Sequence, residues 1–223
     1  MDEIETTQNV HQEDSFAILL ESFKRLLGDN FDAYQPWLLK LASLYEGPIT
    51  LNPGEVLWDM GETRADHYFV VDGFLSEYWI NDFGEAFIYA FIGSREYCVN
   101  EFKYLFGEPS RSRLEVLQPT RVLRLSQEAE RELRNEASPW EQLSYEVGRE
   151  ILAKRRERIR WLSTKKEEHL QKLAAKYPEL LKHGTKEHLA AYLGVSRATV
   201  YRLIENRNRN KSSNETRDND ERD

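Results

Sequence analysis

The chain has 223 residues, of which 40% are hydrophobic and 12% aromatic, enough for one large or two small domains with their own cores. No run approaches the roughly 20 apolar residues needed to cross a bilayer, and the acidic, polar beginning MDEIETTQNV is unlike a secretory signal. The single cysteine, Cys98, excludes an intramolecular disulfide and a cysteine-ligated iron–sulfur or zinc site. We therefore expect a cytoplasmic protein without a membrane partner.

The formal net charge of −8 hides a strong asymmetry along the chain. Residues 1–148 carry 12 basic and 27 acidic side chains, whereas residues 149–211 carry 17 basic and 7 acidic ones. A segment as basic as 149–211 attracts a polyanion locally, whatever the charge of the whole chain. Charge alone is equally consistent with a solvated helical surface. The motifs within this segment are therefore needed to distinguish nucleic-acid binding from that alternative.

The first part of the chain changes from an unpatterned segment to helical spacing. Residues 1–14 lack hydrophobic periodicity, which predicts a disordered N-terminus. From Phe16 to Leu44 apolar residues recur at helical spacing, which predicts one or two helices. Pro36 suits the first turn of a second helix, because proline is tolerated where no backbone donor is needed.

Between Ile49 and Leu125 short β-type runs alternate with turn residues. The pair Asp72-Gly73 joins two such runs and predicts a hairpin, because this pair tolerates the positive φ angles of a type I′ turn. Asn81-Asp82-Phe83-Gly84 predicts the next turn. Many short strands at regular intervals are typical of an antiparallel sandwich or jelly-roll barrel. We therefore predict an α+β fold with an N-terminal jelly-roll barrel, flanked by helices, at residues 15–137.

After Ser126 the pattern is helical, with a short helix at residues 127–135 and a long one at residues 138–163. The long helix is predicted to start with Ser138 as N-cap and Pro139 at the first helical position. Its apolar seam has a spacing of about 3.5 residues, with a basic interruption at residues 154–156. Such a seam can pack on the barrel or pair with its copy in a second subunit. The candidate dimer contacts are Trp140, Leu143, Val147, Ile151 and Ile159.

The most specific stretch is a helix-turn-helix pattern within the predicted C-terminal domain, residues 164–206. Thr185 is placed to cap the first helix, Gly194 lies where the chain must turn sharply, and Ser196 caps the second helix. Residues 207–223 are polar and predict a disordered tail. Leu189, Ala190, Leu193, Val200, Leu203 and Ile204 are spaced to face a core, whereas Arg197, Ala198, Tyr201 and Arg202 face outward, as in a helix that enters a major groove.

Residues 185–205 resemble the helix-turn-helix of the Crp/Fnr family of bacterial transcription regulators, whose pattern is similar to T-x-x-x-[IL]-A-x-x-[IL]-G-x-S-x-x-T-[VI]-x-R-x-[IL]. The resemblance covers about four-fifths of the chain. It implies that the long helix forms a dimer interface. The family's usual wing strands after the second helix are not evident. In the middle of the chain Leu51-x-Pro53-Gly54-Glu55, Gly61-Glu62 and Tyr68-Phe69-Val70-Val71-x-Gly73 are similar to turns and strands of the family's cyclic-nucleotide-binding barrel.

The resemblance also implies how the second helix contacts DNA. Arg197 and Arg202 match two family arginines, one of which can bond a guanine edge through two donors. Ala198 stands where the family often has glutamate, so its methyl group is suited to contact thymine instead of accepting from cytosine. Ser196 and Thr199 are expected to bond phosphate. The candidate DNA-binding residues are therefore Ser196, Arg197, Ala198, Thr199, Tyr201 and Arg202.

In the cyclic-nucleotide-binding members a Gly-Glu pair and a later Arg-Ser pair hold ribose and phosphate. Glu101 and Arg111-Ser112 fall at the family separation, but Asn100 replaces the glycine and Arg113 follows the serine in place of a small residue. Glu101 and Arg111 could equally form an exposed ion pair. A cyclic nucleotide, another small effector and no ligand at all therefore stay open. The candidate effector residues are Asn100, Glu101, Arg111, Ser112 and Arg113.

Two other classes of function were weighed against a regulator. A cupin-like metalloenzyme needs clustered histidines and carboxylates on inward-facing strand positions, and His67 is the only histidine in the barrel segment. A ligand-sensing barrel that signals through protein contacts alone does not explain the basic C-terminal half. We therefore expect a Crp/Fnr-type regulator without catalytic residues or metal ligands. It is expected to bind near-palindromic double-stranded DNA as a homodimer and to contact RNA polymerase.

Overall fold

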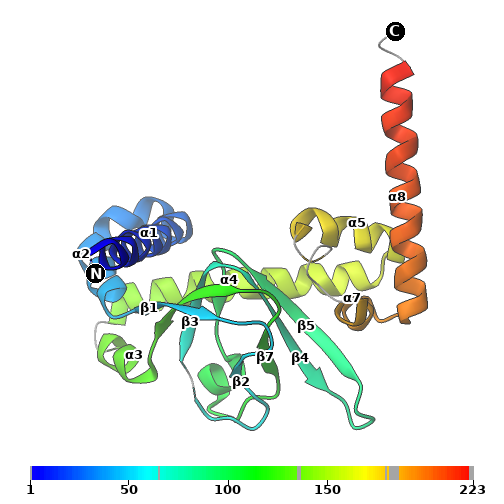
Figure 1. Cartoon of the computed structure of the whole chain (residues 1–223). Helices are drawn as coiled ribbons and strands as arrows, with labels where there is room; N and C mark the ends of the chain where they lie inside the picture. Colours follow the sequence, from blue (N-terminus) through cyan, green and yellow to red (C-terminus); the bar gives the residue numbers. More distant parts are fainter. Residues whose placement is uncertain (1, 65, 135–136, 179, 181–185, 221–223) are drawn as a thin grey trace.

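The computed structural model describes residues 2–64, 66–134, 137–178, 180 and 186–220, and it confirms the predicted α+β class, with helices around an antiparallel β-sandwich (Figure 1). No helix in these ranges has an apolar stretch long enough to cross a bilayer. The helices are α1 (Asp2–Leu27), α2 (Phe31–Ser43), α3 (Gln127–Arg134), α4 (Ala137–Leu162), α5 (Lys166–Lys176), α7 (Lys186–Leu193) and α8 (Arg197–Asp220), with a 3₁₀ turn η1 (Gly28–Asn30) and a π-helical turn η2 (Phe102–Phe106). The strands are β1 (Glu46–Leu51), β2 (Val56–Trp58), β3 (His67–Asp72), β4 (Phe74–Ile80), β5 (Ala86–Gly93), β6 (Tyr97–Cys98), β7 (Arg113–Val116) and β8 (Thr120–Leu125).

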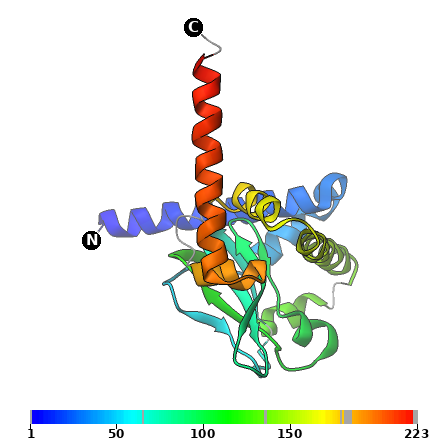
Figure 2. The same cartoon turned by 90° about the vertical axis from the view of Figure 1, so that its right-hand side faces the viewer.

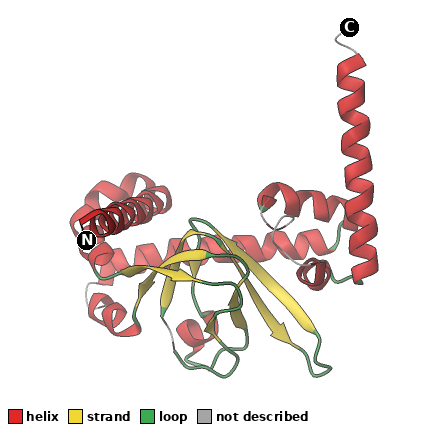
Figure 3. Ribbon diagram, in the orientation of Figure 1, coloured by secondary structure: helices red, strands yellow, loops and turns green. Residues whose placement is uncertain are grey.

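The strands form two four-stranded antiparallel sheets, in the orders β1-β8-β3-β6 and β2-β7-β4-β5 (Figure 3). Between them lies a core of alternating inward-facing side chains, with Val70 and Val122 from the first sheet and Leu75 and Leu114 from the second. All four side chains are fully buried. This inter-sheet core fixes the register of both sheets, because a slip of one residue would turn the apolar side chains outward.

The expected hairpin at Asp72-Gly73 is wrong, because β3 and β4 belong to different sheets. At Gly73 (φ +119°) the chain crosses from the first sheet to the second, and a Cβ there would lie 2.2 Å from Thr120 Oγ1. The Phe74 amide donates to the same Thr120 hydroxyl oxygen at 3.1 Å. Glycine is therefore required by a close approach of two strands rather than by a type I′ turn. The predicted turn at residues 81–84 does join a hairpin, β4–β5, with Gly84 at φ +78°.

Helical structure extends further than predicted at both ends of the described chain. Residues 2–14 and 207–220, expected to be disordered, continue α1 and α8. Neither stretch contains proline or glycine to stop a helix, and each prolongs a helix that tertiary packing has already started, so no new nucleus is needed. Pro36 lies inside α2 rather than in its first turn, and the buried Trp37, Leu38 and Leu41 stabilise that helix by packing.

Two further apolar cores lie outside the sandwich and place the long helix α4. The first packs α1, α2 and the beginning of α4 on the outer face of the first sheet, with Phe23, Leu38 and Trp140 buried in it. The second packs α5, α7 and α8 against Phe74 and Phe91 of the second sheet. Helix α4 runs along the sandwich from the first core to the second (Figure 1). It therefore connects the N-terminal helices, the sheets and the C-terminal helices mechanically.

Replacing Gly73 by alanine should lower the free energy of unfolding by about 2–4 kcal/mol, because the new methyl group collides with Thr120 and the backbone is strained for an L-residue. Gly84→Ala, also at positive φ but with nothing within 4 Å of the added Cβ, should cost only about 1 kcal/mol. Urea unfolding of the two variants compares these costs. Equal losses would contradict the crossing at Gly73.

Candidate nucleic-acid interface and barrel pocket

Helices α7 and α8 form the predicted helix-turn-helix. Gly194 adopts φ +64°, and the Val195 amide donates to the Ala190 carbonyl at 3.1 Å, which closes the end of α7. The Ser196 hydroxyl oxygen accepts the Thr199 amide at 3.2 Å and thus caps α8, as predicted. The expected cap at Thr185 lies outside the described residues.

The two faces of the motif are divided as the sequence predicts. Leu189, Leu193, Val200 and Leu203 are buried, and Ala190 allows the close contact between the helices. The predicted DNA-binding side chains Arg197, Ala198, Tyr201 and Arg202 are all exposed on the first turns of α8. Thr199 is half-buried, and its hydroxyl lies 3.0 Å from that of Ser196.

Arg197 contacts Glu187 of α7, with 2.7 Å between Nη1 and Oε1. Both side chains are more than half exposed, so the pair contributes little and Arg197 can leave it for a stronger acceptor. Tyr201 is 58% exposed, so its ring and hydroxyl group are accessible on the same surface. The first turns of α8 therefore present two guanidinium groups, a methyl group and a phenol to solvent.

Helix α8 does not end after the motif. It continues as one helix of 24 residues to Asp220 and projects away from the rest of the chain (Figure 2). No strand follows it in the described part of the chain, so a wing is absent there, in line with the sequence. Arg207 and Arg209 prolong the basic character beyond the motif.

The helix-turn-helix packs on β5 directly through Tyr192 of α7, whose ring centroid lies 4.7 Å from that of Phe91. It is also tied to β5 by Arg158 of α4 and by Tyr177, the residue after α5. Arg158 of α4 donates from Nη2 to the carbonyl of Ile88 at 2.7 Å and to that of Tyr192 at 3.3 Å. The Tyr177 hydroxyl donates to the Phe91 carbonyl at 3.2 Å. Because Arg158 is buried and bonds both to β5 and to α7, the position of α4 is linked directly to that of the helix-turn-helix.

The predicted effector residues are not brought together into one site. Arg111 is exposed, donates to Glu108 at 2.7 Å and lies over the Phe102 ring. Arg113 pairs with Asp59, and Asn100 Oδ1 accepts the Lys103 amide at 3.3 Å. The alternative of an exposed Glu101–Arg111 ion pair is also wrong, because each side chain has a different partner.

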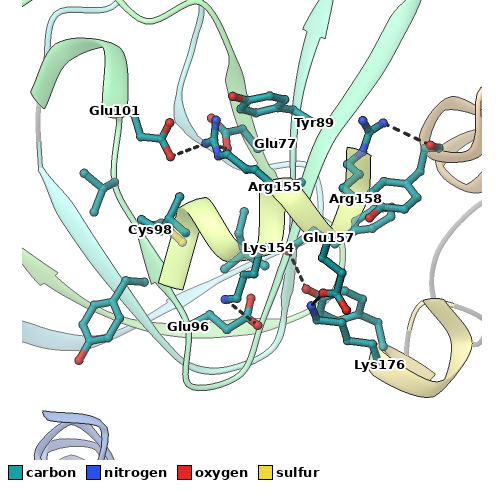
Figure 4. Close-up of a pocket in the computed structure, with 18 of the residues that line it drawn as sticks. Glu77, Tyr89, Glu96, Cys98, Glu101, Lys154, Arg155, Glu157, Arg158 and Lys176 are labelled. Atoms are coloured by element: carbon teal, nitrogen blue, oxygen red, sulfur yellow. Dashed lines mark hydrogen bonds and ion pairs between the residues drawn. The ribbon is translucent and has the colours of Figure 1, made fainter. Parts of the chain in front are cut away.

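A pocket lies between α4 and the second sheet, lined by Glu77, Glu101 and Arg155 among others. It holds a cluster of charged side chains that the sequence did not predict. Arg155 reaches from α4 into the sandwich, where Nη2 lies 2.6 Å from Glu101 Oε1 and 3.5 Å from Glu77 Oε2 (Figure 4). Its guanidinium carbon lies 3.9 Å from the centroid of the Tyr89 ring. The Ser112 hydroxyl donates to Glu77 Oε1 at 2.6 Å.

Two carboxyl groups share one guanidinium in this cluster. Burial raises the pKa of Glu77, although Arg155 and the Ser112 hydroxyl act in the opposite direction. Burial and the neighbouring Glu77 raise the pKa of Glu101 to about 8, and burial lowers that of Arg155. With Arg155 charged and Glu77 ionised, the cluster is closest to neutral when Glu101 is protonated, and the raised pKa of Glu101 favours that form.

The predicted effector residues are not gathered around one phosphate-sized space in this structure, and a cyclic nucleotide stays an open expectation. The arginine expected to neutralise the phosphate, Arg111, lies outside the pocket, and two carboxyl groups face the space where an anion would lie. The cavity beside Arg155 measures about 50 Å³, which is room for a few water molecules. Arg155 thus takes the place of a ligand in the barrel.

The predicted dimer contacts on α4 divide into two groups. Trp140 and Leu143 are buried in the core of their own chain, which contradicts their prediction as dimer contacts. Val147 and Ile151 are half-buried beside the barrel, and their role in a dimer stays a prediction. Ile159 is 68% exposed. It belongs to a stripe at seven-residue spacing with Tyr145 and Leu152, which are 63% and 50% exposed. We call Tyr145, Leu152 and Ile159 the α4 stripe.

Sequence signals for the missed residues existed but were ambiguous. The basic interruption at residues 154–156 broke an otherwise apolar seam, and Glu77 broke an apolar strand. Each reads as an ordinary surface charge in isolation. Only the fold shows that Arg155 and Glu77 meet, 78 positions apart, in the interior.

No protein-family model and no curated protein matches the sequence. Solved structures match the fold. The c-di-GMP-responsive global regulator CLP of Xanthomonas campestris aligns with a TM-score of 0.62 at 15% identity, over 78% of this chain and 91% of that chain. FixK2 of Bradyrhizobium japonicum aligns with a TM-score of 0.58 at 17% identity, over 71% and 82%. TTHA1359, a CRP/FNR-family transcriptional regulator of Thermus thermophilus, gives 0.51 at 22% identity, over 73% and 86%. The chain therefore has the fold of Crp/Fnr transcription regulators.

Glu101→Gln should remove a pH dependence of stability. The folded carboxyl has a pKa of about 8 against 4.5 in the unfolded chain, so the native state binds the proton more tightly and the parent chain loses stability as pH rises from about 5 to 8. Relative to the variant we expect a loss of about 3 kcal/mol over that window. Urea unfolding at both ends of the window measures it.

Glu108→Gln provides the control, because Glu108 is an exposed carboxylate bonded to Arg111. Its stability difference from the parent chain should be the same at both pH values. The account of the buried cluster fails if Glu101→Gln shows the same flat profile as this control.

Proposed function

We propose that the chain is a sequence-specific DNA-binding transcription regulator of the Crp/Fnr type. The observation that carries this proposal is the capped, fully exposed beginning of α8, with Arg197, Ala198, Tyr201 and Arg202 on one surface of a packed helix-turn-helix. Long donor side chains at the start of a second helix are suited to base edges in a major groove. The matching fold of solved regulators supports the same function.

The proposed contacts divide between bases and phosphates. Arg202 and Arg197 are the candidates for guanine, since a guanidinium can donate to O6 and N7 together. Ala198 would contact a thymine methyl group. The hydroxyls of Ser196 and Thr199 lie at the positive end of α8, where a phosphate is favoured by the helix dipole and by free backbone amides.

We further propose that two chains pair through the α4 stripe. Its seven-residue spacing is the pattern of a two-stranded coiled coil, and its three apolar side chains are otherwise left in water. Pairing along α4 would give a twofold dimer, as a near-palindromic site requires. The two α8 helices would then enter successive major grooves about 34 Å apart. RNA polymerase is the further partner we propose for such a bound dimer.

Replacing Arg202 by alanine should weaken binding to duplexes selected from a random pool at least tenfold, and it should relax the base preference at one position of each half-site. Fluorescence anisotropy at one fixed salt concentration measures the affinity, because phosphate contacts make it salt-dependent. Arg131→Ala removes an exposed arginine on α3, remote from α8, and should leave affinity unchanged. Equal effects of the two substitutions would contradict base reading by Arg202.

Replacing Ile159 by glutamate should convert the dimer to monomers, since a charge would replace the apolar contact at the stripe. Sedimentation velocity at micromolar concentration measures the change. Leu39→Glu is the matched control, because Leu39 of α2 is also a solvent-exposed aliphatic side chain, at 50%, but lies outside the stripe. An Ile159→Glu chain that stays dimeric would rule out pairing through α4.

A further inference from the structure

A second, larger cavity lies between the N-terminal half of α4, the end of α2 and the turn η2. Its volume is about 260 Å³, and Trp140, Leu143, Tyr104 and Leu125 are among the side chains that line it. We call it the α4 cavity. It adjoins the space around Arg155, with which it shares the lining residues Tyr97, Val99, Glu101 and Ile151.

The α4 cavity is larger than packing defects of ordinary protein interiors. Cores seldom contain voids larger than a water molecule, and an apolar void of roughly 150 Å³ is known to take up benzene. At about 260 Å³ the α4 cavity suits a molecule of about two fused rings. The apolar lining disfavours filling by water, which needs several polar partners.

Gly148 supplies an independent sign that something outside this chain occupies the space. It lies inside α4 and borders the cavity, and a Cβ added there would meet no atom within 4 Å. Glycine weakens a helix interior relative to alanine, and no positive φ or close contact within the chain requires it here. The surface of α4 at Gly148 therefore leaves the mouth of the cavity uncovered, beside Leu152 of the α4 stripe.

The polar groups at the cavity define the charge of a suitable ligand. Glu101 borders the cavity, and its Oε1 lies 2.6 Å from Arg155 Nη2, so a charge on this carboxyl group is already paired within the chain. Burial also raises the pKa of Glu101 to about 8, which favours the uncharged form that can donate a hydrogen bond. Ser144 and Tyr104, whose hydroxyls lie 3.3 Å apart, offer further neutral groups. The imidazole of His67 is already 3.2 Å from Glu130. No lysine or arginine is among the described residues that line the α4 cavity, and His67 already has the carboxylate Glu130 as its partner.

We propose that the α4 cavity binds a small uncharged molecule built on one or two aromatic rings, with a single hydrogen-bonding group that faces Glu101. We further propose that this molecule is the effector of the regulator. The second part rests on the proposed function, whereas the binding site does not. The partner's α4 would close the mouth at Gly148 and Leu152, so the site is complete only in the dimer.

The contacts of α4 provide a physical route from this cavity to DNA. One helix borders the cavity at Gly148, reaches Glu101 through Arg155 and bonds β5 and α7 through Arg158. A ligand that favours one position of α4 therefore favours one position of the helix-turn-helix. The effect on DNA affinity equals the difference in ligand affinity between the two positions.

Indole is a suitable probe, because it is neutral, has two fused rings and carries one donor. Calorimetric titration of the full-length dimer with indole should give one site per chain, while indole-3-acetate and cyclic AMP should not compete. Gly148→Phe and Val147→Phe, which place a ring in the cavity, should each raise the indole Kd at least tenfold. Ala153→Phe adds the same ring at an exposed α4 residue outside the cavity lining and should leave the Kd unchanged.

Unfolding temperatures confirm that each variant is folded, and either cavity variant alone is sufficient for the comparison. The site is overturned if indole fails to bind at millimolar concentration, if both cavity variants bind it like the parent chain, or if the anionic compounds compete. Anisotropy on selected duplexes tests the effector role separately. Indole that binds in the cavity but leaves DNA affinity unchanged overturns the effector role alone, whereas a chain that selects no duplex refutes the proposed function and leaves the site standing.

Discussion

Arg155 is buried where α4 crosses the sandwich, and its guanidinium between Glu77 and Glu101 is the contact on which the arrangement of the chain depends. Removing a charge from water is costly unless partners surround it, so this arginine holds α4 at one position along the barrel. About one helical turn further along α4, Arg158 donates hydrogen bonds to backbone carbonyl groups of β5 and α7. The position of the helix-turn-helix therefore follows from the electrostatics of the barrel interior.

This cluster changes the relation between fold and ligand. The fold is shared with regulators of the Crp/Fnr type, yet the barrel interior is closed by the chain's own arginine, and the arginine expected to bind a phosphate lies on the surface. The open space lies elsewhere, in an apolar cavity under the first half of α4. A common architecture can therefore enclose a differently lined space, because the lining depends on a few side chains rather than on the strands.

Structural features that are determined by residues close together in the sequence could be predicted, whereas features that depend on distant residues could not. The helix-turn-helix was predictable, since Gly194, the Ser196 cap and the apolar spacing act within 20 residues. Asp72-Gly73 was misread, because the need for glycine comes from Thr120, a residue distant in sequence. The Arg155 cluster and the buried side of α4 at Trp140 depend on which face of a helix meets which sheet. The periodicity of a sequence shows which face of a helix is apolar, but it does not show which other element packs against that face.

Protection of a selected duplex from hydroxyl radicals tests the central claim, that α4 pairs two chains so that two α8 helices read one DNA site. The account predicts two protected segments on one face of the duplex, centred about one helical turn (roughly 10–10.5 base pairs) apart and related by an inverted repeat. Protection of a single segment, or of segments in direct repeat, would contradict a twofold dimer built on α4.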